Sequence, residues 1–209
     1  MNNSKIPKII HQVWIGPDTI PKWCADYAVE MKRVHEELGW KYVFWGNEEL
    51  KAYEDDIYIS KFIEKKEAWS VVVDRLRLLI LRDYGGVYID VDSSIVKPLD
   101  HCLDKTSDNI SFFCGLRATR RNPRYCFIEV SVLGSAKNSR MANVLVDSYN
   151  AHDLRNASTG GDLGEVIRNN LDVDTAVFNK NYFYSKNIEQ DTIILHRDLG
   201  SWKVDYKLN

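Results

Sequence analysis

Two aspartates, Asp90 and Asp92, stand one residue apart at the end of the apolar run in GGVYIDVDSS, residues 85–94. A carboxylate is costly to bury, so each must be solvated, paired with a cation or bound to a metal. On a strand, residues i and i+2 point the same way and lie about 6 to 7 Å apart, so the pair would face one site. Such oxygens suit Mg²⁺ or Mn²⁺, with phosphate and water completing the coordination. An exposed acidic turn is the competing interpretation of the pair by itself.

The helix expected before this strand carries a second pair of charged residues. Asp74 and Arg77 are three residues apart in VVVDRLRLLIL, which places them on one helical face. An isolated surface ion pair would have little energetic value. The helix, however, meets Gly85-Gly86 and then the acidic strand end, so the chain brings both pairs towards one region. There an arginine could hold a phosphate, and an aspartate could accept hydrogen bonds from sugar hydroxyls.

The surrounding pattern predicts an α/β fold. In the first half, strands expected at Lys8–Ile15, Trp40–Trp45 and Val87–Val91 alternate with helical segments at Pro21–Leu38 and Ile59–Tyr84. In the second half we expect strands at Ile110–Cys114, Phe127–Leu133, Thr175–Phe178 and Thr192–Leu195, helices at Ser139–Tyr149 and Asp162–Asn170, and a mobile loop at Arg117–Arg124. Alternating strands and helices favour a sheet of parallel strands. Ligands bind at the carboxyl ends of such strands, where Asp90 and Asp92 are expected.

Length and composition limit the function classes. The chain has 209 residues, which suits one domain. Its net charge of -2 gives no overall positive electrostatic field that would attract nucleic acid. The four cysteines form no C-x-x-C pair and are expected to be reduced packing residues of a cytoplasmic protein. The longest apolar runs are too short to span a bilayer, so we expect no transmembrane segment. Contact with a membrane surface stays open.

Two motifs carry a family resemblance. The run VVVDRLRLLILRDYGGVYIDVD, residues 71–92, resembles the D-x-x-R, G-G-x-Y and D-x-D signature of DXD-containing glycosyltransferases. These include glycosyltransferase family 32, the yeast-type initiating mannosyltransferases, bacterial capsule sugar transferases and the catalytic domain of large clostridial toxins. The segment IPKIIHQVWIG, residues 6–16, resembles the family's opening strand. Later matches are looser: His196 with Gly200-Ser201-Trp202 resembles a terminal H…SW element, and Thr159-Gly160-Gly161 resembles a T-G-P turn with glycine replacing proline.

The resemblance implies a GT-A fold, a single α/β domain over 1–209 with a Rossmann-like, mostly parallel sheet flanked by helices. It places donor binding in about residues 1–100 and the acceptor side in about 101–209. Trp14 would stack on the nucleotide base beside Val13, although a core aromatic is the alternative for Trp14. Asp74 and Arg77 would hold the donor sugar and diphosphate, which Ser201 and Trp202 would also contact.

The resemblance also implies a metal ion, Mn²⁺ in preference to Mg²⁺. Asp92 is the expected direct ligand, Asp90 would reach the ribose or bind through water, and His196 is a candidate third ligand or else a structural histidine. Asp162 is the candidate acceptor-side carboxylate. His11 is expected to be a hydrogen-bonded strand residue rather than a catalyst.

The implied reaction transfers a sugar from a nucleoside-diphosphate sugar to a glycan or other hydroxyl acceptor, with retention of configuration. A UDP-sugar is the favoured donor, a GDP-sugar is possible, and polysaccharide biosynthesis is the expected setting. One alternative is a haloacid-dehalogenase-like phosphatase using Asp90, Asp92 and Ser94, with Asp162 and Glu165 approximating its later acidic pair. The other alternative is a nucleotide-sugar-binding domain without catalysis.

Overall fold

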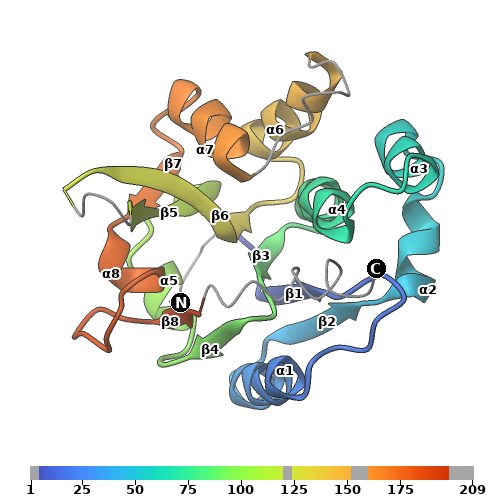
Figure 1. Cartoon of the computed structure of the whole chain (residues 1–209). Helices are drawn as coiled ribbons and strands as arrows, with labels where there is room; N and C mark the ends of the chain where they lie inside the picture. The colour runs from blue at the N-terminus through green and yellow to red at the C-terminus, as the bar shows by residue number, and fades with distance from the viewer. Residues whose placement is uncertain (1–4, 120–123, 152–159, 198–209) are drawn as a thin grey trace.

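A six-stranded sheet forms the centre of the computed structural model, which describes residues 5–119, 124–151 and 160–197 (Figure 1). Its strand order is β2 (Lys41–Trp45), β1 (Ile9–Val13), β3 (Gly86–Ile89), β6 (Cys126–Ser135), β5 (Phe112–Ala118) and β7 (Thr175–Phe178). β1 pairs in parallel with β2 and β3, and β5 pairs in parallel with β7. Only β6 runs against its neighbours, so the predicted mostly parallel sheet is confirmed.

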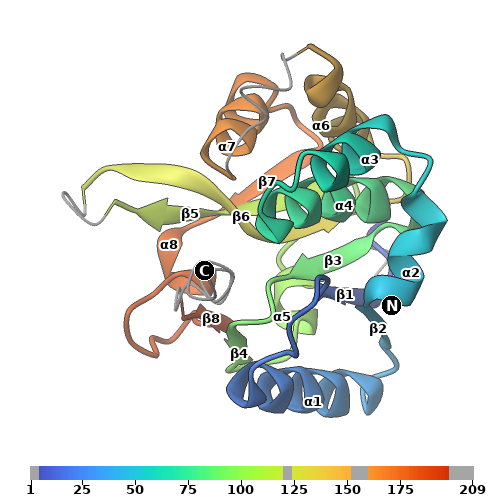
Figure 2. The same ribbon diagram turned by 45° about the vertical axis from the view of Figure 1, so that its right-hand side comes forward.

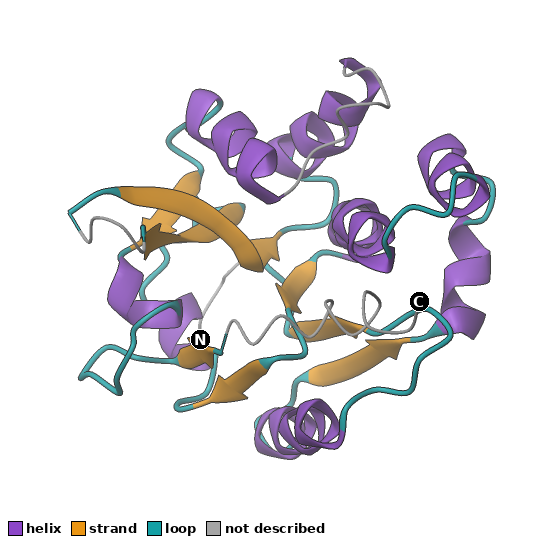
Figure 3. Cartoon of the chain, viewed as in Figure 1, coloured by secondary structure: helices purple, strands orange, loops and turns teal. Residues whose placement is uncertain are grey.

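Helices cover both faces of this sheet, as Figures 2 and 3 show. One face carries α3 (Ile57–Glu64), α4 (Trp69–Tyr84), α6 (Arg140–Ala151) and α7 (Gly160–Asn169), whose apolar side chains share one core with the sheet. The opposite face carries α1 (Lys22–Glu36), α5 (Asp100–Leu103), α8 (Lys180–Phe183) and a small sheet of β4 (Ser93–Ile95) with β8 (Ile194–His196). None of the helices in the described segments has the length and apolar character needed to cross a bilayer.

The predicted elements are present, with differences at several boundaries. The helical segment expected at Ile59–Tyr84 is divided into α3 and α4 around Lys66, whose φ of 54° interrupts the helix. The expected loop Arg117–Arg124 is partly wrong, because Arg117 and Ala118 belong to β5 and pair with Phe127 and Cys126 of β6. Five short elements were not predicted, because three or four residues are too few to show a periodic pattern. They are α2 (Asn47–Leu50), the 3₁₀ turn η1 (Lys51–Tyr53), β4, α5 and α8.

The glycine pair allows α4 to stop and β3 to enter the sheet at once. Gly85 and Gly86 have φ values of 67° and 98°, in the region that side chains with a Cβ rarely adopt. The Gly85 N–H closes the last turn of α4 on Leu81 O at 3.0 Å. A Cβ on Gly86 would lie 2.5 Å from Ile9 O of the neighbouring strand. The close approach of β1 and β3 therefore depends on the missing side chain.

We expect Gly86→Ala to lower the free energy of unfolding by about 3 kcal/mol or more, because positive φ and a backbone clash act together. For a chain of this size, that corresponds to a fall in Tm of roughly 6 to 12 °C. The control is Gly39→Ala, which has a similar φ of 79° and no atom within 4 Å of the added Cβ. Thermal unfolding of the two variants checks the prediction, and equal losses would show that backbone strain alone is responsible.

Candidate active site

The acidic pair lies in a turn beyond the end of β3. β3 ends at Ile89, and the Ser93 N–H donates to Asp90 O at 3.2 Å, so Asp90 and Asp92 do not alternate along a strand as expected. The chain then enters β4, which pairs antiparallel with β8 and sets Ser93 opposite His196. This pairing brings His196 beside the two carboxylates. The expected strand geometry was wrong, but the expected convergence is present.

Asp90, Asp92 and His196 form a compact group, called here the acidic cluster. One ligand atom from each residue lies within 4.8 Å of the others. His196 Nε2 is 3.1 Å from Asp92 Oδ1 and 3.6 Å from Asp90 Oδ2. Two carboxylates and an imidazole are a suitable donor set for Mn²⁺, and the oxygens also suit Mg²⁺. These residues therefore fit a divalent cation.

The charges of the acidic cluster compensate one another without a metal. Burial by itself would lower the pKa of His196, but hydrogen bonds and charge interactions with Asp90 and Asp92 outweigh it and raise the pKa to about 10. Burial would likewise raise the pKa of Asp90, but Arg77 and His196 hold it below its usual value. The imidazole is thus protonated at neutral pH in the metal-free protein. It must release that proton before Nε2 can ligate a cation.

Asp74 and Arg77 form a buried pair rather than the surface pair that their spacing also allowed. Arg77 Nη2 donates to the Asp74 carboxylate. Arg77 Nη1 donates to Val130 O at 3.0 Å and lies 3.6 Å from Asp90 Oδ1. The Arg77 side chain is 7% exposed and that of Asp74 13%. Burial raises the pKa of Asp74 to about 6 although the charge of Arg77 opposes the rise. The structure therefore brings Asp74, Arg77 and Asp90 together.

Tyr88 is a site residue to which the sequence analysis gave no role. Its hydroxyl donates to Asp90 Oδ1 at 2.6 Å, and the Arg77 guanidinium lies over its ring, 4.6 Å from the centroid. Tyr88 thus orients Asp90 and fills the space beneath Arg77. The available signal was the tyrosine of the G-G-x-Y motif, two residues before Asp90.

The N-terminal motif holds the acidic turn in place by hydrogen bonds. Gln12 is fully buried, donates to Asp90 O at 3.3 Å and accepts from the Tyr42 hydroxyl at 2.7 Å. His11 Nδ1 lies 3.1 Å from Trp45 Nε1, which can only donate, so Nε2 carries the hydrogen and donates to Gly85 O at 2.8 Å. His11 is therefore a hydrogen-bonded strand residue. The N-terminal motif therefore holds both ends of β3 by hydrogen bonds, at Gly85 before the strand and at Asp90 after it.

We expect His11 to give the fold a pH dependence. Burial, more than the charge of Lys41, lowers the pKa of His11 from 6.5 to about 4. Between these two pH values His11 is therefore protonated in the unfolded chain and neutral in the folded chain. The contribution of His11 to stability is then full above pH 6.5 and falls towards pH 4, with a loss of about 2 kcal/mol by pH 5. His11→Gln keeps a donor for Gly85 O and should remove the part of the slope that His11 contributes. Urea unfolding between pH 7 and pH 5 checks the difference, and parallel curves for the two proteins would contradict it.

A pocket adjoins the acidic cluster on the side of β1 and α4. Among the residues lining it are Val13, Trp14, Asp18, Trp69, Arg77 and Asp90. Trp14 is half-buried, and its Nε1 donates to Asp18 O at 2.8 Å, which holds the ring in place. We call this space the Trp14 pocket. Sequence reasoning missed Trp69, which lines the pocket together with the rings of Trp14 and Tyr88; its only signal was its position at the start of the D-x-x-R helix.

Three predicted site residues are not placed beside the acidic cluster by the described structure. Asp162 lies in the first turn of α7, and its side chain is not among those described. Gly160 and Gly161 begin that helix rather than forming the expected turn. Ser201 and Trp202 lie outside the described residues. The roles expected for Asp162, Ser201 and Trp202 therefore stay predictions.

Comparison with known proteins begins with the sequence. Residues 21–109 match a family described as "Glycosyltransferase sugar-binding region containing DXD motif". The inositol phosphoceramide mannosyltransferase 1 of Schizosaccharomyces pombe is 33% identical over 107 residues, which are 49% of this chain and 33% of that protein. An uncharacterized glycosyltransferase of Acanthamoeba polyphaga mimivirus is 26% identical over 231 residues, covering 97% of this chain and 86% of the viral protein. The chain thus spans only about a third of the yeast relative.

Solved structures share the fold at low sequence identity. A glycosyltransferase involved in glycosylation of the major capsid of PBCV-1 superposes with a TM-score of 0.59 at 13% identity, covering 95% of this chain and 96% of the other. The galactosyltransferase LgtC, solved with donor and acceptor sugar analogues, superposes with a TM-score of 0.51 at 10% identity, covering 95% and 93%. These neighbours are GT-A glycosyltransferases, so the expected fold is confirmed. In sequence and in fold, the chain is thus similar to DXD-containing glycosyltransferases.

Proposed function

We propose that this chain is a metal-dependent glycosyltransferase that moves a sugar from a nucleoside-diphosphate sugar to a hydroxyl acceptor. The observation that carries the proposal is the acidic cluster at the edge of the Trp14 pocket, which shares Asp90 with it. A pocket with aromatic rings suits a nucleotide base, and a carboxylate–imidazole cluster suits a cation that binds phosphate. The two sites adjoin, as the base and the diphosphate of one nucleotide-sugar require.

In this proposal each part of the donor has its own residues. Trp14 stacks on the base beside Val13, Asp90 reaches the ribose, and Asp74 with Arg77 bounds the space for the sugar and diphosphate. Asp90, Asp92 and His196 would hold Mn²⁺ or Mg²⁺, which when bound supplies a Lewis acid for the charge that develops on the diphosphate. Gln12 and Tyr88 orient Asp90 from its backbone and its side chain. Ser201 and Trp202 contact the departing diphosphate.

The acceptor hydroxyl attacks the sugar on the face that the diphosphate leaves, so configuration is retained and no protein nucleophile is needed. Asp162 is the acceptor-side carboxylate of this proposal. Several relatives are named as mannosyltransferases, which makes GDP-mannose a donor to test beside the UDP-sugars favoured from the sequence. Polysaccharide or glycolipid building is the setting that we propose.

A thermal-shift panel tests the proposal, because a ligand that binds the native state raises its stability. UDP, GDP, UDP-glucose, UDP-galactose and GDP-mannose are each added with Mn²⁺, with Mg²⁺ or with a chelator. We expect one nucleotide family to raise Tm only with a metal, and the matching sugar donor to release its nucleoside diphosphate. The absence of any metal-dependent shift would contradict the proposal. Binding without turnover would support the non-catalytic domain, and hydrolysis of p-nitrophenyl phosphate would support the phosphatase.

We expect Trp14→Ala to weaken binding of the nucleoside diphosphate by about 1 to 3 kcal/mol, which is the scale of base–aromatic stacking. Trp23→Ala is the matched control, because Trp23 packs against Tyr27 on α1 and does not line the Trp14 pocket. Titration calorimetry with Mn²⁺ present measures both affinities. An unchanged affinity in folded Trp14→Ala would leave Trp14 as a core aromatic.

A further inference from the structure

A second and larger cleft adjoins the acidic cluster. Its volume is about 620 Å³, compared with about 90 Å³ for the Trp14 pocket. The end of β5, α8 with the segment that follows it, and the end of β8 form its lining. His196 lines this cleft and Asp90 lines the Trp14 pocket, and the two side chains are 3.6 Å apart. The two spaces therefore meet at the acidic cluster, and we call the larger one the β8 cleft.

The charge of the β8 cleft is one-sided. Its lining holds the cationic residues Arg117, Lys180, Lys186 and Arg197, and one carboxylate, that of Glu189. Arg117 is paired with Glu129 at 2.9 Å, whereas no ion pair engages the other three cations within residues 5–119, 124–151 and 160–197. A chain with a net charge of -2 thus presents a local excess of positive charge beside its acidic cluster.

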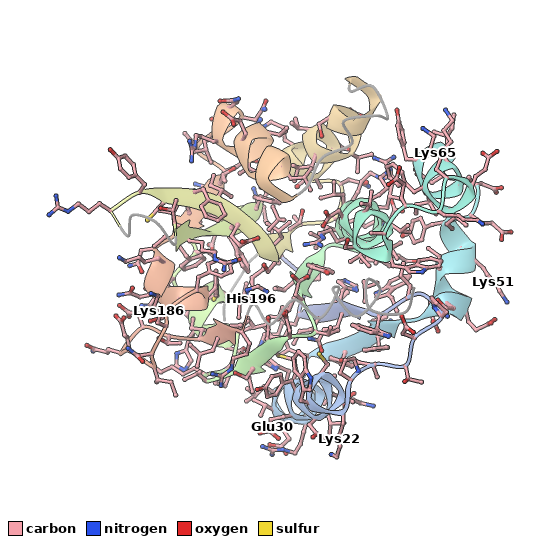
Figure 4. The ribbon with its side chains drawn as sticks, in the orientation of Figure 1. Lys22, Glu30, Lys51, Lys65, Lys186 and His196 are labelled. Atoms are coloured by element: carbon pink, nitrogen blue, oxygen red, sulfur yellow. The ribbon has the colours of Figure 1, made fainter. Side chains whose placement is uncertain are left out.

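The three cations come from separate places around the cleft. Arg197 directly follows His196, and its backbone N–H donates to Asp92 O at 3.0 Å, which holds this residue next to the acidic cluster. Lys180 begins α8, and Lys186 lies in the segment after it, towards the outer edge of the molecule (Figure 4). Arginine and lysine pair well with carboxylate and phosphate, and a concave charged surface concentrates ligands of opposite sign.

We infer that the acceptor of this enzyme carries an anionic group, a phosphate or a carboxylate, that Lys180, Lys186 and Arg197 bind in the β8 cleft. The inference rests on the proposed function, because it places the acceptor opposite the donor across the acidic cluster. During transfer, the acceptor oxygen bonds to the anomeric carbon, the bond from that carbon to the diphosphate breaks, and the acceptor proton passes to the departing diphosphate. The anionic group holds the acceptor and is not consumed.

Binding of simple sugars to the full chain tests this inference. The protein is first saturated with Mn²⁺ and the nucleoside diphosphate that it binds, and is then titrated calorimetrically with glucose, glucose 6-phosphate, glucuronate or inorganic phosphate. We expect at least one of the two acidic sugars to bind, and glucose to bind at least tenfold more weakly. The double variant Lys180→Gln/Lys186→Gln should raise the Kd of the acidic sugar about tenfold or more, because two charged contacts are lost.

Lys65→Gln is the matched control, because Lys65 is exposed and lies on the other side of the molecule in Figure 4. Equal binding of glucose, equal binding of inorganic phosphate, no binding of either acidic sugar, or an unchanged Kd in the double variant would each overturn the inference. Nucleotide binding is read out first in the same titration. Its failure would overturn the proposed function and this inference together, whereas nucleotide binding without selective binding of an acidic sugar would overturn this inference alone.

Discussion

Asp92→Asn is expected to reduce sugar transfer by about 100-fold or more and to abolish the rise in Tm that Mn²⁺ produces with a nucleotide. Asp92 is 4% exposed, and its Oδ1 lies 3.1 Å from His196 Nε2 in the acidic cluster. Asparagine keeps the size of the side chain but removes the charge that a divalent cation requires. A metal at a departing diphosphate contributes several kcal/mol to the transition state, and each 1.4 kcal/mol lost is a factor of about ten in rate.

The same substitution should change the metal-free fold much less than it changes activity. The expected observations are a retained cooperative unfolding transition, no metal-dependent shift in Tm, and transfer at background level. Asp26→Asn is the control, because Asp26 is an exposed residue of α1 whose partner is Lys22. Metal-dependent transfer at the wild-type rate in Asp92→Asn would remove Asp92 from the metal site.

The second large effect is expected from Arg77→Gln, which should lower the free energy of unfolding by about 3 to 5 kcal/mol and also impair transfer. Arg77 is 6% exposed and compensates Asp74 and Asp90, both of which would lose a buried cationic partner. Removing one member of a buried pair is costly because it leaves an uncompensated charge. The carbonyl of Val130 would also lose its donor.

Arg82→Gln on the same helix provides the comparison. Arg82 pairs with Asp83 near the end of α4, and both side chains are about one third exposed. An exposed pair contributes about 0 to 1 kcal/mol, so this variant should be close to wild type. Chemical denaturation measures both variants, and a small loss in Arg77→Gln would show that solvent or another group compensates Asp74 and Asp90. Acidification should reduce the cost of the substitution, because protonated carboxyl groups need no cation.

Much of the arrangement of the residues proposed to bind the donor was predictable, because it depends on the pattern of residues close together in the sequence. β1 and β3 were expected as strands, and parallel neighbours have their carboxyl ends at one edge, so Trp14 and Asp90 line one pocket. Asp74 and Arg77 were expected on one helical face and are hydrogen-bonded. The burial of that pair was not predictable, because i,i+3 spacing is the same on an exposed face and on a face packed against β6.

The acidic cluster depends on contacts that have no local signal. His196 reaches Asp92 through the pairing of β4 with β8, two strands of three residues that lie about a hundred positions apart in the chain. The tyrosine that orients Asp90 and the glutamine that binds its backbone were visible as residues, but their partners were not. The β8 cleft likewise draws its cations from β5, from α8 with the segment after it, and from the residue after β8, which meet only in the folded chain.

The residue pattern by itself determined the class of fold, the stop at Gly85-Gly86 and the presence of two carboxylates at a strand end, because these depend on neighbours in the chain. The tertiary structure decided that Asp90 and Asp92 converge through a turn, that His196 joins them, and that Arg77 is buried against both Asp74 and Asp90. It also placed three cations in the cleft that adjoins this cluster. The physical reason is that charge compensation and ligand geometry depend on distances through space, which strand pairing and packing set and which spacing along the chain does not encode.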